Sequence, residues 1–375
     1  MIVKTITCHQ VYNYGASLQQ LALVEFLNSH GYTTESISYK PSYLADVHKL
    51  FSCVNPKWNK NIITKVGYIS VKLPQRLKLL KRKKQFNSFE SKYIPVTDKV
   101  YIDNEQLKAI RHDADVFICG SDQIWNPLFP NGTDPAFYLD FVQNNEALKI
   151  SYAASFATDS LPQENIDFVK NQVSNLDLIS VRETSGQKIL NQLGFTKVEQ
   201  VLDPVFLLNK KQWNNYAKDE SEAKKYILIY DFDNNPNIKK MAKKIAKKHG
   251  FFIIGLNQNL KYVDKNYYLK GPSDFLSLIR DAELVLTTSF HALAFGLIFE
   301  RRLGVFNRHI SINTRMRDLL DLVGLSDHLI ENSQDLDLTD FDINYATINV
   351  KLESHIKRSK DFLLGSITSK YKKGK

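Results

Sequence analysis

Residues 2–39 read IVKTITCHQVYNYGASLQQLALVEFLNSHGYTTESISY, and this stretch decides the fold. Residues 2–8 form a short apolar run with β-branched side chains, which predicts a strand. Apolar residues recur at helical spacing through residues 16–30 and Gly31 follows as a C-cap, so this part predicts a helix. Residues 35–39 predict a second strand. The stretch therefore predicts one βαβ unit with two parallel strands.

The same alternation recurs along the rest of the chain in two series. The first series continues with strands expected at 116–120, 150–153, 178–182 and 199–202, and helices at 163–176 and 183–193. After the Asp203-Pro204 pair and a helix-like segment at 210–217, the second series has strands expected at 226–230, 251–256, 284–288 and 303–306, and helices at 238–249, 273–280, 291–299 and 316–323. Strands that alternate with helices over short loops are typical of parallel sheets covered on both faces. The sequence therefore predicts an α/β fold with two Rossmann-like domains facing a cleft.

A break near residues 204–225 sets the expected domain boundaries. Residues 1–204 form the first Rossmann-like domain, residues 205–344 the second, and residues 345–375 a C-terminal helix and basic tail. Residues 49–92 have basic helical patterning and no clear strand. They are expected to be an insertion in the first domain that covers the cleft or faces a partner. The C-terminal helix is expected to pack back on the first domain.

The composition is that of an ordinary globular protein. The chain has 375 residues, of which 43% are hydrophobic and 24% charged, and this excludes a mainly disordered chain. Cys8, Cys53 and Cys119 lack the spacing of a disulfide framework or zinc ribbon and fit a reducing cytoplasm. The most apolar stretch, residues 282–299, is interrupted by polar side chains and is too short to span a bilayer. Because the first residues also lack a signal-like apolar segment, we expect a soluble, cytoplasmic protein.

The net charge of +10 suggests nucleic acid or an anionic membrane as a partner. The excess lies in three segments, with seven basic residues in 72–84, six in 239–248 and four in 370–375. The basic residues of these three segments together outnumber the net charge of +10, so the rest of the chain has a net negative charge. The basic runs are not interleaved with aromatic residues as in single-strand binders, and no nucleic-acid partner is expected. Solvated helix faces explain such runs; the sharper hypothesis is that helix 72–84 holds the protein peripherally at anionic lipid headgroups.

Four polar clusters follow predicted strands, where ligands bind in doubly wound folds. The first is Asn13-Tyr14-Gly15, in which a glycine entering a helix lets backbone N–H groups approach an anion or a hydroxyl-rich ligand. The alternative is a plain turn with Asn13 as the helix cap.

Dinucleotide and Walker A fingerprints, HExxH, GxSxG and Cys/His sets with metal-ligand spacing are all absent from the sequence. Neither a nucleotide nor a metal is therefore implied.

The second cluster follows the strand expected at 116–120. Ser121, Asp122 and Gln123 stand in succession, and Trp125 supplies an aromatic face that can stack on a sugar. A serine or aspartate that only caps a helix is the alternative.

The third cluster is the pair Arg182-Glu183. The planar fork of Arg182 suits a phosphate or carboxylate. A salt bridge within the domain, with Glu183 at the first turn of a helix, is equally open.

The fourth cluster surrounds Ser289 and His291, between an apolar strand and an apolar helix. A histidine there is usually a satisfied core residue, but its place at a helix N-terminus favours phosphate binding. A cationic group follows shortly downstream and suits a dianionic substrate. Its members are Asn307, Arg308, His309, Thr314, Arg315 and Arg317.

In order along the chain, these segments resemble the polysaccharide pyruvyl transferase family. The resemblance is carried by NYGASLQQLAL, FICGSDQIWNP, SYAASF, SVRETSG, VLDPVF, TTSFHALAFGLIF and FNRHISINTRMRDLLDLVGL, over roughly residues 1–325. Residues 49–92 and the C-terminal helix do not contribute to it. The resemblance implies a fold similar to the two-Rossmann glycosyltransferases of the B type.

The resemblance also implies the reaction. Family members use phosphoenolpyruvate as donor substrate, with no cofactor, and transfer pyruvate to sugars of bacterial surface polysaccharides, commonly as a cyclic ketal. The acceptor would be such a polysaccharide or its lipid-linked precursor. Arg182, Arg308 and Arg315 are then the expected cations for the donor, with the helix N-terminus at Ser289 and His291 aimed at its phosphate.

The remaining roles follow from the same reading. His291 is expected to act as an acid or as a phosphate ligand, and Asp122 as the base for the acceptor hydroxyl. The other expected substrate-binding residues are Asn13, Tyr14, Gly15, Ser121, Gln123, Trp125, Glu183 and Asn307.

Two alternatives remain open from the sequence. One is a nucleotide-sugar glycosyltransferase of the same fold, in which Glu300 would hold the ribose. The other is a non-catalytic protein that binds an anionic surface.

Overall fold

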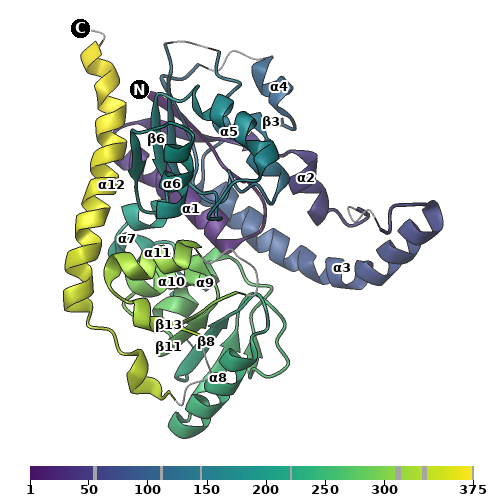
Figure 1. Cartoon of the computed structure of the whole chain (residues 1–375). Coiled ribbons are helices and arrows are strands. Elements are labelled where there is room, and N and C mark those ends of the chain that lie inside the picture. The colour runs from purple at the N-terminus through teal and green to yellow at the C-terminus, as the bar shows by residue number, and fades with distance from the viewer. Residues whose placement is uncertain are drawn as a thin grey trace.

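The structure is a computed structural model that describes residues 1–53, 57–109, 113–143, 146–219, 222–308, 314–331 and 336–373. It contains two sheets, and every strand pair in both is parallel (Figure 1). The first sheet has the order β3-β2-β1-β4-β5-β6-β7 and the second β10-β9-β8-β11-β12-β13. The predicted α/β class with two Rossmann-like sheets is confirmed.

The strands have the following bounds: β1 (Ile2–Ile6), β2 (Thr33–Tyr39), β3 (Val96–Tyr101), β4 (Val116–Cys119), β5 (Leu148–Ala154), β6 (Leu178–Val181), β7 (Val198–Gln200), β8 (Tyr226–Tyr230), β9 (Phe252–Gly255), β10 (Lys265–Asn266), β11 (Leu284–Thr287), β12 (Arg302–Phe306) and β13 (Leu329–Ile330). The α-helices are α1 (Tyr14–Ser29), α2 (Ser42–Ala45), α3 (Ile62–Tyr93), α4 (Asn104–Lys108), α5 (Ile166–Val173), α6 (Thr184–Gln192), α7 (Lys210–Asn214), α8 (Pro236–His249), α9 (Pro272–Arg280), α10 (Phe290–Ile298), α11 (Thr314–Val323) and α12 (Tyr345–Lys373). A short 3-10 helix, η5 (Pro204–Leu207), follows the first sheet.

The segment expected to be a basic helical insertion contains one long helix. Residues 62–93 form one helix of 32 residues, α3, which begins at a capping box made by Asn61 and Thr64. The helix leads into β3, which pairs with β2 at the edge of the first sheet. The described residues of 49–92 contain no strand, as expected, and α3 forms the crossover between the two parallel strands β2 and β3.

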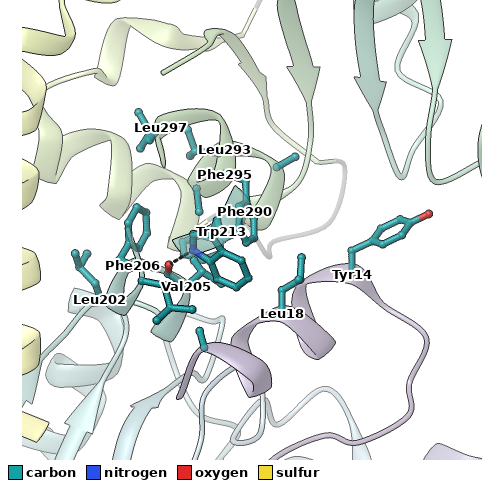
Figure 2. Close-up of a cluster of buried hydrophobic side chains, with 14 of the residues drawn as sticks. Tyr14, Leu18, Leu202, Val205, Phe206, Trp213, Phe290, Leu293, Phe295 and Leu297 are labelled. Atoms are coloured by element: carbon teal, nitrogen blue, oxygen red, sulfur yellow. Dashed lines mark hydrogen bonds between the residues drawn. The ribbon is translucent and has the colours of Figure 1, made fainter. Parts of the chain in front are cut away.

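A buried apolar core joins the two sheets across the break near residue 204 (Figure 2). Leu18 of α1 lies in the same cluster as Val205 of η5, Trp213 of α7 and Phe295 of α10. The Trp213 indole donates a hydrogen bond to the Val205 carbonyl at 2.9 Å and packs edge-on to Phe295. A shared core of this kind fixes the carboxyl ends of the two sheets relative to each other.

The C-terminal helix α12 runs along both halves of the molecule (Figure 1). Ser359 of α12 accepts a hydrogen bond from the Leu202 amide at 2.9 Å, and Arg358 forms an ion pair with Glu199. The prediction that this helix packs back on the first half is confirmed. Across the ranges given above, no helix combines the length and apolar character that crossing a membrane requires.

Candidate functional site

A pocket of about 220 Å³ lies where the carboxyl ends of the two sheets meet. Its walls come from the loops after β1, β4, β8, β11 and β12 and from the start of α11. The lining residues are Asn13, Asp122, Gln123, Phe232, Thr288, Ser289, Phe290, His291, Arg308, Arg315 and Met316. Seven of the residues that the sequence singled out are thus brought together: Asn13, Asp122, Gln123, Ser289, His291, Arg308 and Arg315.

His291 lies in the first turn of α10, where Ser289 is the N-cap and its hydroxyl accepts from the Ala292 amide. Its side chain is 8% exposed, and Nε2 lies 3.5 Å from Asp203 Oδ2. On its other side the ring lies against Gly15, where a Cβ would come within 1.9 Å of His291 Nδ1. Gly15 is therefore needed for close approach of the ring, and Asn13 just before it caps α1 with bonds to the Gly15 and Ala16 amides.

We predict that Gly15→Ala lowers turnover by about 10²-fold, because the new methyl displaces the His291 ring by more than about 1 Å. Release of phosphate from phosphoenolpyruvate, the donor that the family resemblance implies, would measure this. Gly365→Ala is the matched control, since Gly365 lies in α12 with nothing within 4 Å of an added Cβ. If Gly15→Ala kept the turnover of the wild type, the close contact between Gly15 and the His291 ring would not matter for activity, which would contradict this prediction.

A buried charge cluster supports the pocket from beneath. Arg182 donates to Asp203 and lies 3.3 Å from Asp122, and its side chain is 2% exposed. Burial by itself would raise the pKa of Asp203, but the neighbouring His291 and Arg182 lower that pKa below its ordinary value. Asp122 is shifted in the same direction, because Arg182, His291 and Arg315 outweigh burial and lower its pKa. Both carboxylates are therefore ionised at neutral pH.

Arg315 is the cation of this cluster that reaches the pocket. Its Nη1 lies 3.4 Å from Asp122 Oδ1, its Nε has no hydrogen-bond partner, and burial lowers its pKa to about 10. With its amide oxygen turned toward Arg315, Gln123 accepts from Nη1 at 3.2 Å. Arg308 lies across the pocket, with its guanidinium 4.8 Å from the centre of the Phe232 ring and its Nε 3.5 Å from Asp233. The pocket thus offers two guanidinium groups and the N-terminus of α10.

Several residues expected to bind substrate do not line this pocket. Trp125 is fully buried, stacks on Tyr138 and donates to the Phe137 carbonyl, so its face is closed to a sugar. Tyr14 is also fully buried, and its hydroxyl donates to the Lys270 carbonyl. These two assignments to the acceptor side were wrong, because both rings complete the apolar core.

The polar members of the same set are structural. Ser121 is buried and donates to the Ala153 carbonyl at 2.8 Å. Glu183 is buried and accepts from the Phe156 and Ala157 amides, which holds the loop after β5. Arg182 serves the charge cluster, and Asn307 is absent from the lining, while His309 lies outside the described residues. For the pair Arg182-Glu183 the structure favours the intradomain alternative that the sequence left open.

Glu300 lies at the wrong end of α10 for a ribose ligand. It follows the last turn of the helix, about 13 Å along the axis from the pocket, where it pairs with Lys210 at 2.7 Å and with Asn349 of α12. The role given to it in the glycosyltransferase alternative is therefore not supported.

A second cavity, of about 760 Å³, lies beside the first, between α3 and the carboxyl ends of β1 and β2. The β1–α1 loop separates the two, since Asn13 lines the first and His9 and Gln10 line the second. Lys40 and Glu90 also line this second cavity, which we call the α3 cavity. Glu90 is 3% exposed, accepts from Ser17 at 2.7 Å through Oε1, and has no partner for Oε2.

We predict that Glu90→Gln stabilises the protein at pH 8 by on the order of 2 kcal/mol. Burial raises the pKa of Glu90 from 4.5 to about 7, so its carboxyl contributes stability below pH 4.5 that is lost as the pH rises through 7. The amide keeps the Ser17 bond without the charge. Urea unfolding at pH 5 and pH 8 measures this, and a gain that is equal or larger at pH 5 would contradict it.

Two buried carboxylates of these sites, Asp203 and Glu90, were missed from the sequence. Asp203 follows β7 as part of Asp203-Pro204, and the pair was interpreted only as the break between domains. Glu90 lies near the end of the basic helix, where its burial has no sequence signal. A carboxylate directly after a strand was the available signal for Asp203.

Comparison with known proteins gives both a family and a fold. A family model described as polysaccharide pyruvyl transferase matches residues 13–309. No curated protein matches the chain. Among solved structures, a putative UDP-N-acetylglucosamine 2-epimerase from Listeria monocytogenes aligns over 99% of this chain and 97% of its own, with 10% identity and a TM-score of 0.50. UGT89C1 from Arabidopsis thaliana, complexed with UDP-L-rhamnose, aligns over 98% of both chains with 10% identity and a TM-score of 0.48. At 10% identity the likeness to the Listeria structure concerns the two-sheet fold alone.

Proposed function

Because the chain belongs to the polysaccharide pyruvyl transferase family, we propose that it transfers the pyruvyl group of phosphoenolpyruvate to a sugar of a bacterial surface polysaccharide or its lipid-linked precursor. Membership of the family makes the chain a transferase. The observation that carries the finer proposal is the pocket that gathers Arg308, Arg315 and the N-terminus of α10 around His291. A donor with one carboxylate and one phosphate needs such a set of cations and amides.

Within this proposal the donor lies between the two arginines. Arg315, which lines the pocket, offers its guanidinium group to the donor carboxylate. Arg308 and the N-terminus of α10 at Ser289 face the phosphate. Arg182 acts beneath them, because its charge offsets Asp122 and Asp203 and leaves Arg315 available to the donor.

The reaction begins when an acid adds a proton to the methylene carbon, which becomes a methyl group and leaves cationic character on the neighbouring carbon. A sugar hydroxyl adds to that carbon and loses its proton to a base. The carbon–oxygen bond to phosphate then breaks with both electrons on the phosphate. A second hydroxyl adds to the same carbon and loses its proton, which closes the cyclic ketal and leaves inorganic phosphate.

Two residues of the pocket suit the proton transfers. His291 is the candidate acid, and a positioned acid contributes about 10²–10⁴-fold. Asp122 is the candidate base for the acceptor hydroxyl, because the cations that lower its pKa keep it ionised. They also weaken it as a base, but a hydroxyl that attacks an electron-poor carbon is already more acidic than a free one.

The α3 cavity is the proposed acceptor side. The β1–α1 loop contributes to the walls of both cavities, and the walls of the α3 cavity carry many groups that hydrogen-bond hydroxyls. These groups are His9, Gln10, Ser38, Lys40, Asn87, Ser88, Glu90 and Ser91. In this proposal the α3 cavity binds the acceptor sugar, which the sequence analysis had expected to stack on Trp125.

The test is phosphate release from phosphoenolpyruvate across a panel of methyl glycosides and lipid-linked sugars. The proposal expects release with at least one acceptor and a pyruvyl ketal on that sugar by mass spectrometry. Transfer of a sugar from a nucleotide donor, with phosphoenolpyruvate inert, would replace the proposal with the glycosyltransferase alternative.

A further inference from the structure

The outer half of α3 and the loop before it project from the rest of the molecule (Figure 1). We call residues 49–53 and 57–81 the arm. The buried residues of α3 are Phe86, Phe89 and Glu90, all in the inner part of the helix that reaches the body. Nothing in the functions described so far requires the arm to extend this far.

The arm is braced by its own contacts. The Arg76 guanidinium donates to the carbonyls of Leu50 and Ser52, both at 2.7 Å, which ties the loop to α3. Trp58 stacks on Tyr68, and the Arg76 guanidinium lies 5.7 Å from the centre of the Tyr68 ring. These contacts hold the loop and the outer half of α3 together as one unit.

An apolar stripe runs along the helix of the arm. Its members are Ile62, Val66, Ile69, Leu73, Leu77 and Leu80. At 100° per residue they fall within a sector about 80° wide. Ile62 at the outer end is 77% exposed and its neighbour Ile63 is 80% exposed, while Trp58 and Phe51 of the loop are also exposed. A contiguous apolar surface of this kind marks a place where something binds.

The charge of the same region has a single sign. Residues 47–89 contain eleven lysines and arginines and no aspartate or glutamate. A helix with an apolar face, basic flanks and aromatic residues near its end has the features of one that lies in a membrane interface. Lysines near an anionic lipid surface each contribute about 1 kcal/mol to binding.

We propose that the arm binds the surface of an anionic lipid bilayer, with Ile62, Ile63 and Trp58 entering the headgroup region and the lysines facing the lipid phosphates. Two arms paired with each other would place eight cations against eight, with no carboxylate in either arm to offset them. Nucleic acid would match the charge but would leave the aliphatic stripe exposed, since bases stack on aromatic rings.

The proposal is tested by flotation of the full chain with vesicles of phosphatidylcholine alone or mixed with phosphatidylglycerol. The wild type should float with the anionic vesicles only. The triple variants Lys65→Gln/Lys72→Gln/Lys78→Gln and Ile62→Ser/Ile63→Ser/Val66→Ser should each bind about 100-fold more weakly. The matched control is Lys240→Gln/Lys243→Gln/Lys247→Gln, which removes the same charge from the exposed face of α8 and should bind as the wild type does.

Three outcomes would overturn the proposal: no flotation of the wild type, equal flotation with both vesicle types, or equal loss in the α8 control. Light scattering could instead show a doubled mass in solution that the variant Ile62→Ser/Ile63→Ser/Val66→Ser abolishes. That result would assign the stripe to contact with a second copy of the chain and overturn the proposal. Matching circular dichroism melting curves for all variants exclude unfolding as the cause of a loss.

Discussion

Replacing His291 by alanine is expected to lower phosphate release from phosphoenolpyruvate, measured with an acceptor that the panel identifies, by about 10²–10⁴-fold. The expectation rests on the position of the ring, which lies in the pocket at the N-terminus of α10 between Gly15 and Asp203. No other described histidine lines that pocket.

The same variant separates the two tasks open to His291. If the ring supplies the proton, turnover falls while the affinity for phosphoenolpyruvate is kept. If the ring holds the phosphate, the affinity falls as well. His30→Ala, at the exposed end of α1, is the control and should be unchanged. Full turnover of His291→Ala would remove the residue from the mechanism.

Replacing Arg182 by leucine is expected to cost about 3–5 kcal/mol of unfolding free energy. The change leaves Asp203 without its main cation and deprives Asp122 of one of two arginines, at a site where both acids are ionised and mostly buried. Urea unfolding monitored by circular dichroism measures this loss.

Two further variants check that cause. Arg182→Leu/Asp203→Asn should recover part of the stability, since the uncompensated charge is removed. Arg358→Leu, which breaks an exposed ion pair with Glu199, should cost no more than about 1 kcal/mol. A loss below about 1 kcal/mol for Arg182→Leu would contradict the cluster as described.

Much of the fold could be predicted because apolar residues are spaced differently along its strands and its helices. Leu284–Thr287 and Phe290–Ile298, for example, are a β-branched run and a helical run separated by a polar turn. The strands that the sequence did not reveal are at sheet edges. Both β10 and β13 have two residues, and β3 has an exposed middle. Such strands depend on pairing with a neighbour, which the local pattern does not record.

The site could be predicted in part for a related reason. Polar residues after strands identified His291, Arg315 and Asp122, because the topology places those loops together. Trp125 misled because an aromatic ring after a polar turn looks the same whether it stacks on a ligand or on Tyr138. The dependence of His291 on Gly15 joins residues far apart in the chain, so it required the structure.

The central claim is that the pocket between the two sheets binds phosphoenolpyruvate, and calorimetric titration of the purified chain tests it without an acceptor. Phosphoenolpyruvate should bind at a single site, and Arg315→Met and Arg308→Met should each weaken it by about 10- to 100-fold, as expected for the loss of a charge-assisted hydrogen bond. The surface variant Arg358→Met should bind as the wild type does. Binding of UDP with no heat from phosphoenolpyruvate, or equal affinity in all three variants, would contradict the account.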